Sequence, residues 1–224
     1  MKNKLKKFKA VLFDMDGIIV DSMPYHFISW FEALREYNVR VLPIDIFGME
    51  GAKWDKVIRY TFKRDGLKFT QKIAQKIFIN RQKLFTKYFK RHIFPEIIKI
   101  INLLKNQRFL IGIVTGSSLA EAKKMLPKNI YNLFDIKVAG DMVKRGKPYP
   151  DSYLLAAKKL NLNPKECIVI ENAPYGIKAA KAAKMYCIAI TTSLPKKYLT
   201  QADKVYLTHK ELYNDFNGRM KSGE

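Results

Sequence analysis

Two aspartates stand close together directly after the first apolar run of the chain. Asp14 and Asp16 follow the run KAVLF, and Gly17 comes immediately after them. On an extended segment, residues i and i+2 point to the same side, and a glycine allows the chain to turn sharply away. Two carboxylates this close are unfavourable unless a cation lies between them, and Mg²⁺ prefers oxygen ligands and keeps waters free to contact a phosphate. A solvated turn is the alternative for an isolated Asp-x-Asp, but the apolar run and the glycine favour a magnesium site.

Three later segments of the chain carry further candidate site residues. They are Thr115, Gly116 and Ser117 in IGIVTGSS, Lys147 in RGKPYPD, and Glu171 and Asn172 in CIVIENAPYGIKAA. Each group has an ordinary explanation, as a helix cap, a solvated lysine or a surface strand end. Taken one at a time, these groups do not identify a chemistry.

The apolar runs themselves predict the elements that position these residues. Runs typical of buried strands occupy residues 9–13, 110–114, 136–140, 167–171 and 186–190. Helix-patterned stretches lie between the later runs, at residues 95–106, 118–126, 151–160 and 174–184. This alternation predicts an α/β fold with a parallel, five-stranded, Rossmann-like sheet covered by helices on both faces. Catalytic groups are expected at the carboxyl ends of such strands.

The segment between the first two strands has a different pattern. Its apolar residues fall at helical spacing, and it contains no run typical of a strand. We therefore expect residues 1–22 and 92–224 to form the α/β core domain, and residues 23–91 to form an all-helical insertion. The polar end of the chain, residues 216–224, is expected to be frayed.

Composition restricts the class of protein and its partners. The chain has 224 residues and a formal net charge of +22, from 42 Lys and Arg against 20 Asp and Glu. A basic surface fits anionic substrates, a lysine-rich proteome or nucleic acid, but no known nucleic-acid-binding motif accompanies it, so no stable nucleic-acid partner is expected.

Hydropathy and cysteine content suggest where the protein acts. Asp14 and Asp16 interrupt the N-terminal apolar run, and no stretch of the sequence is long enough to cross a bilayer. Cys167 and Cys187 lie in short apolar runs, which favours buried thiols over a disulfide. We expect a cytoplasmic protein, monomeric and without a membrane partner.

Taken together, the four groups of polar residues resemble the motifs of the haloacid dehalogenase superfamily, and their order and placement make a coincidence improbable. The resemblance implies a phosphoryl transfer in which Asp14 is phosphorylated and Asp16 acts as general acid and base. It implies that Lys147 and Mg²⁺ offset the phosphoryl charge, and that Thr115 and the amides of Gly116 and Ser117 hold phosphate oxygens. The implied metal site comprises Asp14, Asp16, Glu171 and Asn172.

A closer resemblance is to the β-phosphoglucomutase-like branch, because DGIIVDSMPYHFISW has its pattern and the helical insertion lies between the first two motifs. The insertion would then be a cap domain. His26 would help to position Asp16 when the cap closes, although an ordinary half-buried histidine is the alternative. Lys53 lies near the cap loop that often dictates the substrate in this branch.

Two departures from the branch affect the predicted function. Asn172 stands where many relatives carry a metal-binding aspartate, and Ser118 stands where the mutases carry a lysine. The expected function is a Mg²⁺-dependent phosphatase that hydrolyses a small phosphorylated metabolite, and a sugar or polyol phosphate is the expected substrate. A hexose-phosphate mutase of the β-phosphoglucomutase type is the alternative, and a basic nucleic-acid-binding protein on a degenerate scaffold is a remote one.

Overall fold

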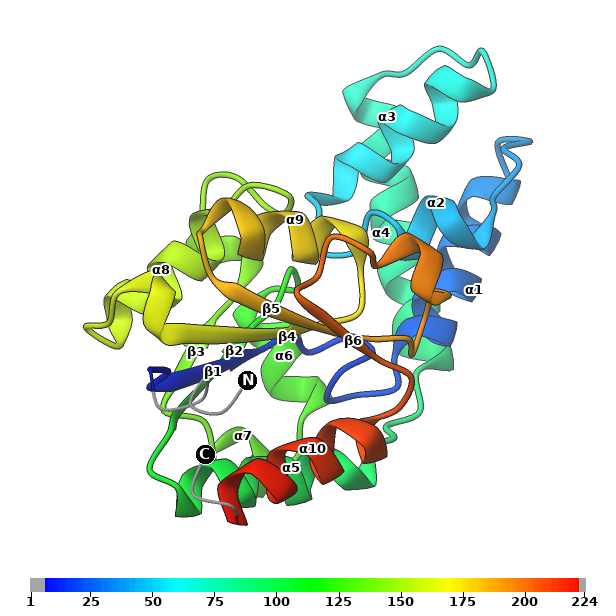
Figure 1. The fold of residues 1–224 in the computed structure, drawn as a ribbon. Helices are drawn as coiled ribbons and strands as arrows, with labels where there is room; N and C mark the ends of the chain where they lie inside the picture. Colours follow the sequence, from blue (N-terminus) through cyan, green and yellow to red (C-terminus); the bar gives the residue numbers. More distant parts are fainter. Residues whose placement is uncertain (1–6, 222–224) are drawn as a thin grey trace.

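The computed structural model describes residues 7–221, and Figure 1 shows its fold. Within these residues a single six-stranded parallel sheet has the order β3-β2-β1-β4-β5-β6. The strands are β1 (Ala10–Phe13), β2 (Leu110–Val114), β3 (Ile136–Val138), β4 (Cys167–Glu171), β5 (Tyr186–Ile190) and β6 (Lys204–Tyr206). The predicted α/β class and parallel sheet are confirmed. The expected number of strands is corrected from five to six, because β6 is a three-residue edge strand that begins with a lysine and has no apolar run.

Alternating side chains of the strands form two hydrophobic cores, one on each face of the sheet. In β1, Val11 and Phe13 belong to one core, whereas Ala10 and Leu12 belong to the other. All four are fully buried, as expected for a central parallel strand covered on both faces. Burial on both faces explains why the central strands have continuous apolar sequences.

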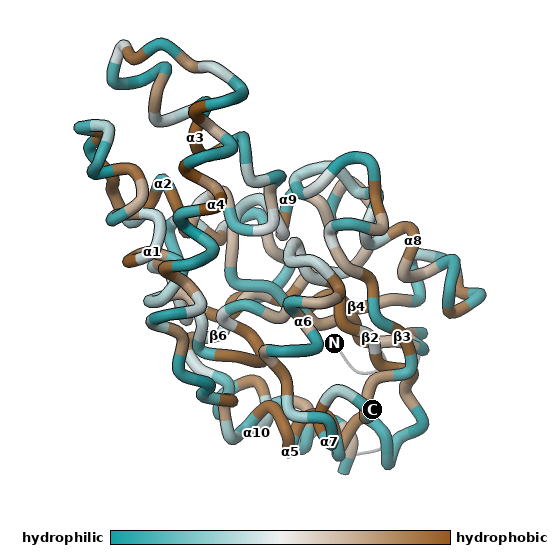
Figure 2. Tube along the Cα trace, turned by 180° about the vertical axis from the view of Figure 1, so that it is seen from behind, coloured by the Kyte–Doolittle hydropathy of each residue, from teal (hydrophilic) through white to brown (hydrophobic). Residues whose placement is uncertain are grey.

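The helices of the α/β unit cover the two faces. The first core includes residues from α5 (Pro95–Asn106), α6 (Leu119–Met125), α7 (Lys128–Tyr131) and α10 (His209–Lys221). The second core includes residues from α8 (Asp151–Lys159) and α9 (Pro174–Ala182). Figure 2 shows α5, α7 and α10 grouped on one side of the sheet. The 3₁₀ helices are η1 (Gly140–Met142), η2 (Pro164–Glu166) and η3 (Lys196–Tyr198).

The C-terminal segment is more ordered than its polar sequence suggests. Helix α10 continues to Lys221, and Phe216 is buried in the first core. The expectation of a frayed tail is therefore wrong for residues 216–221. The buried side chains of Leu212 and Phe216 hold this mostly polar helix against the first core. The rest of that expectation concerns residues 222–224, which lie outside the described residues.

A separate helical unit stands above one end of the sheet (Figure 1). It consists of α1 (Met23–Arg35), α2 (Pro43–Phe47), α3 (Trp54–Arg64) and α4 (Gln71–Tyr88). These helices have a hydrophobic core of their own, which includes Leu34, Ile58, Phe62 and Ile77. None of the helices within residues 7–221 is long and apolar enough to span a membrane.

Two neighbouring connections join the helical unit to the sheet. The Asp21 amide donates a hydrogen bond to the His92 carbonyl at 2.9 Å, and the Phe94 amide donates to the Ile19 carbonyl at 3.1 Å. Val20 and Ile93 form an antiparallel bridge between the two connections. The two crossings therefore lie side by side and form one junction between the helical unit and the sheet.

Candidate active site

The carboxyl ends of three neighbouring strands bring predicted site residues together. Asp14 directly follows β1, Thr115 directly follows β2, and Glu171 is the last residue of β4. These strands are adjacent and parallel, with β1 between the other two. All three side chains are buried.

Lys147 connects two of these carboxylates. It lies in the loop between η1 and α8, and its ammonium group donates hydrogen bonds to Asp14 Oδ1 at 2.7 Å and to Glu171 Oε1 at 2.6 Å. Burial opposes the positive charge, but the two carboxylates outweigh it and raise the pKa of Lys147 above its usual range. Lys147 is therefore a fixed cation beside the Asp14 carboxylate.

The carboxylate of Glu171 is fully occupied by protein donors. Its Oε1 accepts hydrogen bonds from Lys147 and from the Tyr153 hydroxyl, which is 2.9 Å away. Its Oε2 accepts from the main-chain amides of Asn172 at 2.9 Å and Ala173 at 3.2 Å. In this arrangement Glu171 orients Lys147 and has no oxygen free for a metal ion.

Two buried oxygen atoms in the same region lack a partner among the described residues. They are Asp14 Oδ2 and Asn172 Oδ1, while the Asn172 amide nitrogen donates to Ser193 Oγ at 2.8 Å. The loop after β1 and the loop after β4 lie close together, since a Cβ added to Gly17 would be 2.1 Å from Asn172 Nδ2. Burial raises the pKa of Asp14 although Lys147 opposes this, so a cation at Oδ2 would favour the ionised carboxylate.

These two oxygen atoms fit a hard cation that keeps several water ligands. No group of three or more His, Cys, Asp or Glu within residues 7–221 is arranged to hold a metal ion. A bound cation would therefore depend on the Asn172 amide oxygen as well as on the Asp14 carboxylate. Mg²⁺ accepts such a set, because it takes oxygen ligands and usually retains water.

Asp16 is turned toward the helical unit. Its Oδ1 accepts hydrogen bonds from Ser22 Oγ at 2.6 Å and His26 Nε2 at 2.9 Å, and its Oδ2 lies 3.4 Å from the Thr115 hydroxyl and 3.5 Å from the Ser117 hydroxyl. Burial disfavours the charged carboxylate, but His26 and Ser22 outweigh it and lower the pKa of Asp16. The second predicted aspartate is thus held by donors from both the helical unit and the sheet.

Arg81 holds the imidazole of His26 through the ring nitrogen that does not contact Asp16. The Arg81 guanidinium, on α4, donates a hydrogen bond to His26 Nδ1, and the Phe85 ring stacks on the imidazole at 4.6 Å. Because Nδ1 accepts, Nε2 carries the proton that is donated to Asp16. Arg81 is absent from the sequence prediction, since it lies among many basic residues of α4. The one indication in the sequence that Arg81 is buried is its helical spacing from Ala74 and Ile77, which lie on the same buried face of α4.

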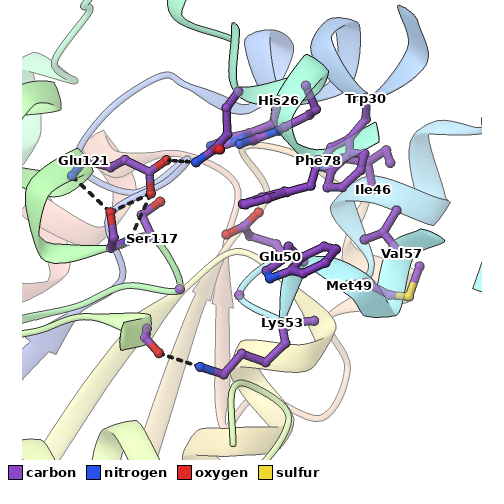
Figure 3. A pocket seen from close by; sticks show the side chains of 18 of the residues that line it. His26, Trp30, Ile46, Met49, Glu50, Lys53, Val57, Phe78, Ser117 and Glu121 are labelled. Atoms are coloured by element: carbon purple, nitrogen blue, oxygen red, sulfur yellow. Dashed lines mark hydrogen bonds between the residues drawn. The ribbon is translucent and has the colours of Figure 1, made fainter. Parts of the chain in front are cut away.

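A cavity of about 380 Å³ lies between the helical unit and the strand ends (Figure 3). His26, Lys53, Gly116 and Ser117, all predicted as site residues, are in its lining, together with Glu50, which was not predicted. The Ser117 amide donates a hydrogen bond to Thr115 Oγ1 at 3.1 Å, so the Thr115 hydroxyl stabilises the turn that follows β2. Asp14, Asp16 and Lys147 are not in this lining, which instead joins residues of the helical unit to residues of the loops after β2 and β3.

On one side of the cavity, the backbone of the helical unit lies in tight contact with the α/β unit. Gly51 has φ +78°, and a Cβ there would lie 2.3 Å from Lys147 Cδ, while a Cβ on Gly116 would lie 2.5 Å from the Gly51 Cα. The Lys53 ammonium donates to the carbonyls of Gly140 at 2.7 Å and Val143 at 3.1 Å. Lys53 therefore joins the helical unit to the α/β unit in this structure.

The chain is similar to known enzymes along most of its length. The sequence model of a family described as haloacid dehalogenase-like hydrolase matches residues 8–184. A phosphorylated carbohydrates phosphatase of Thermotoga maritima is 28% identical over 78% of this chain and 81% of its own length. The β-phosphoglucomutase of Bacillus subtilis is 30% identical over 84% of this chain and 85% of its own. The solved structure of a hydrolase from Pseudomonas syringae, 24% identical, superimposes with a TM-score of 0.83 over 94% of this chain and 98% of that one, which shows the shared fold.

Proposed function

The chain belongs to the haloacid dehalogenase-like hydrolases, in the branch that includes β-phosphoglucomutase, and on this premise we propose that it hydrolyses small phosphate monoesters through an aspartyl phosphate on Asp14. The observation that carries this proposal is the state of the Asp14 carboxylate. One of its oxygens is held by Lys147, and the other is buried without a partner among the described residues. A fixed, poorly solvated carboxylate beside a cation is suited to attack phosphorus.

The proposed reaction has two displacements at phosphorus. In the first, an Asp14 oxygen forms a bond to phosphorus as the bond to the leaving oxygen breaks, and Asp16 gives a proton to that oxygen from its protonated form, which the lowered pKa makes the minor form. In the second, Asp16 takes a proton from a water molecule, which attacks phosphorus and releases Asp14 and inorganic phosphate. His26 and Ser22 hold the Asp16 carboxylate in place for both proton transfers.

We propose Asp14 Oδ2 and Asn172 Oδ1 as the protein oxygens that would hold Mg²⁺, because both are buried without a partner in the described part of the chain. Of the four residues predicted as ligands, Glu171 and Asp16 have carboxylates that already accept hydrogen bonds on both oxygens. When bound, Mg²⁺ would offset charge on the phosphoryl oxygens. Lys147 would offset the same charge from the other side of Asp14.

We propose that residues 23–91 act as a cap over the α/β core of residues 1–22 and 92–224. The paired connections near Val20 and Ile93 would serve as the hinge. Docking of the cap brings His26 to Asp16 and Gly51 to Lys147. The general acid Asp16 and the lysine that holds the nucleophile Asp14 therefore both gain a contact from the docked cap. Catalysis would then occur only while water is largely excluded.

A mutase is the second candidate, because one of the relatives is a β-phosphoglucomutase. A mutase must hold two phosphates, which needs a second set of cations. At the predicted position, Ser118 instead caps α6, where its hydroxyl donates to Glu121 Oε2 at 2.9 Å. Lys53, which could compensate, has its ammonium on two main-chain carbonyls. These contacts favour water as the acceptor.

The proposed function is tested with a panel of phosphate monoesters in the presence and absence of Mg²⁺, by measuring inorganic phosphate. For glucose 1-phosphate with a trace of glucose 1,6-bisphosphate, both inorganic phosphate and glucose 6-phosphate are followed. A phosphatase releases phosphate steadily with little isomerisation. Rapid isomerisation with little phosphate release would instead establish the mutase, and no turnover of any monoester would contradict both candidates.

A further inference from the structure

The carboxylate of Glu50 occupies an unusual place for a phosphate-binding enzyme. Glu50 lies between α2 and α3, and in Figure 3 its side chain points into the cavity, on the side that faces His26. Within residues 7–221 no side chain or amide donates a hydrogen bond to this carboxylate. Glu50 is half-buried, and desolvation together with the nearby negative charge of Asp16 raises its pKa although His26 and Lys147 oppose this.

The Lys and Arg side chains of the cavity lining each bind another group, although the Nε of Arg81 has no partner among the described residues. Among the described residues that line the cavity, Lys53 and Arg81 are the Lys and Arg side chains. The Lys53 ammonium is bound to main-chain carbonyls, and the Arg81 guanidinium donates to His26. Arg81 is also the shared cation for Asp16, Glu50 and Glu121, whose charges all act on it.

The balance of charge in the cavity is therefore the reverse of that in the whole chain. The chain has 42 Lys and Arg against 20 Asp and Glu. The cavity lining has three acids, Glu50, Glu121 and Asp141, against one Lys and one Arg, with His26 in addition. A second anion on a substrate would meet a like charge at Glu50, while Lys53 and Arg81 already hold other groups, so it would bind weakly.

The rest of the lining fits an uncharged carbon skeleton. Trp54 and Phe78 stack with ring centroids 4.7 Å apart, and Trp30, Met49 and Val57 add apolar surface. Apolar faces with a few fixed polar groups are typical of sites for small molecules, and C–H groups of a sugar pack well on aromatic rings. Hydroxyl groups of the same skeleton can donate to the unpartnered Glu50 carboxylate.

We propose that Glu50 selects monophosphates whose leaving group is an uncharged polyhydroxyl compound, and that it rejects substrates with a second phosphate. This inference rests on the proposed phosphatase activity and names its substrate class. Glu50 accepts hydrogen bonds from hydroxyls of the leaving group and repels a second anion at the same position. It is a specificity residue and takes no part in the two proton transfers at Asp16.

The test compares two substrates that differ by one phosphate, glucose 1-phosphate and glucose 1,6-bisphosphate, with the wild type and the Glu50→Gln variant. The expected wild-type kcat/KM is higher for the monophosphate. In Glu50→Gln the ratio of kcat/KM for the bisphosphate over the monophosphate should rise about tenfold, as expected of one like charge across a partly solvated pocket. The rise should shrink as salt is added.

The matched control is Asp55→Asn, which makes the same change of charge on α3, where Asp55 pairs with Arg59 outside the cavity lining. It should leave the substrate ratio unchanged. The inference is overturned if the wild type uses both substrates equally well, or if Glu50→Gln changes kcat/KM for both by the same factor. If the wild type releases phosphate from no monoester, the proposed function itself fails, and the inference fails with it.

Discussion

The contact between Gly51 and Lys147 provides a sharp test of cap docking. Gly51 has φ +78°, and an alanine Cβ there would lie 2.3 Å from Lys147 Cδ. Ordinary contact begins near 3.4 Å, so the cap loop or Lys147 must move by roughly 1 Å in Gly51→Ala, and a displacement of that size near the reacting groups can cost about a hundredfold in rate. We therefore expect kcat/KM to fall by roughly a hundredfold.

Gly66→Ala is the matched control for this prediction. Gly66 also has a left-handed backbone, with φ +70°, but a Cβ there meets no atom within 4 Å. Both variants should lose on the order of 1 kcal/mol of folding stability from the strained backbone, measured by denaturant unfolding. Only Gly51→Ala should lose activity. Equal kcat/KM in the two variants would refute the proposal that the docked cap loop is required for catalysis.

Two further predictions concern the proton donor and the metal site. Asp16→Asn should lower the rate of the first displacement by about 10²- to 10⁴-fold for an alkyl phosphate. The loss should be smaller for p-nitrophenyl phosphate, because a good leaving group needs no proton. Equal loss of this rate with both substrates would contradict the role of Asp16. Asn172→Asp should lower the Mg²⁺ concentration for half-maximal activity roughly tenfold, because it adds a negative charge beside the cation without a change of size. An unchanged or higher half-saturation would place Asn172 away from the metal.

Much of the fold follows from local sequence, and the exceptions have physical causes. The strands β1, β2, β4 and β5 are predictable because burial on both faces demands continuous apolar runs. Strand β6 is not, since an edge strand of three residues, of which the first two are only half-buried, has no such pattern. Helix α10 was missed because its sequence is mostly polar and only a few residues, such as Phe216, reach the core.

The same distinction applies to the site. Residues that directly follow strands, such as Asp14 and Thr115, are brought together by the sheet, so their convergence can be predicted from order along the chain. Arg81 and Glu50 meet the site only through the packing of the helical unit against the sheet. No local pattern distinguishes Arg81 from the other basic residues of α4 except its spacing with buried neighbours. Their positions could not be derived without the tertiary structure.

The central claim is that Asp14 carries the phosphoryl group, and rapid acid quenching followed by peptide mass spectrometry tests it most directly. The Asp16→Asn variant is mixed with p-nitrophenyl phosphate and Mg²⁺, because an activated leaving group allows phosphorylation while loss of the base slows hydrolysis of the intermediate. We expect a phosphoryl adduct on the peptide that contains Asp14, and none when Asp14→Asn is added to the same variant. Release of p-nitrophenol without any protein-bound phosphate, or an adduct on a different residue, would contradict the account.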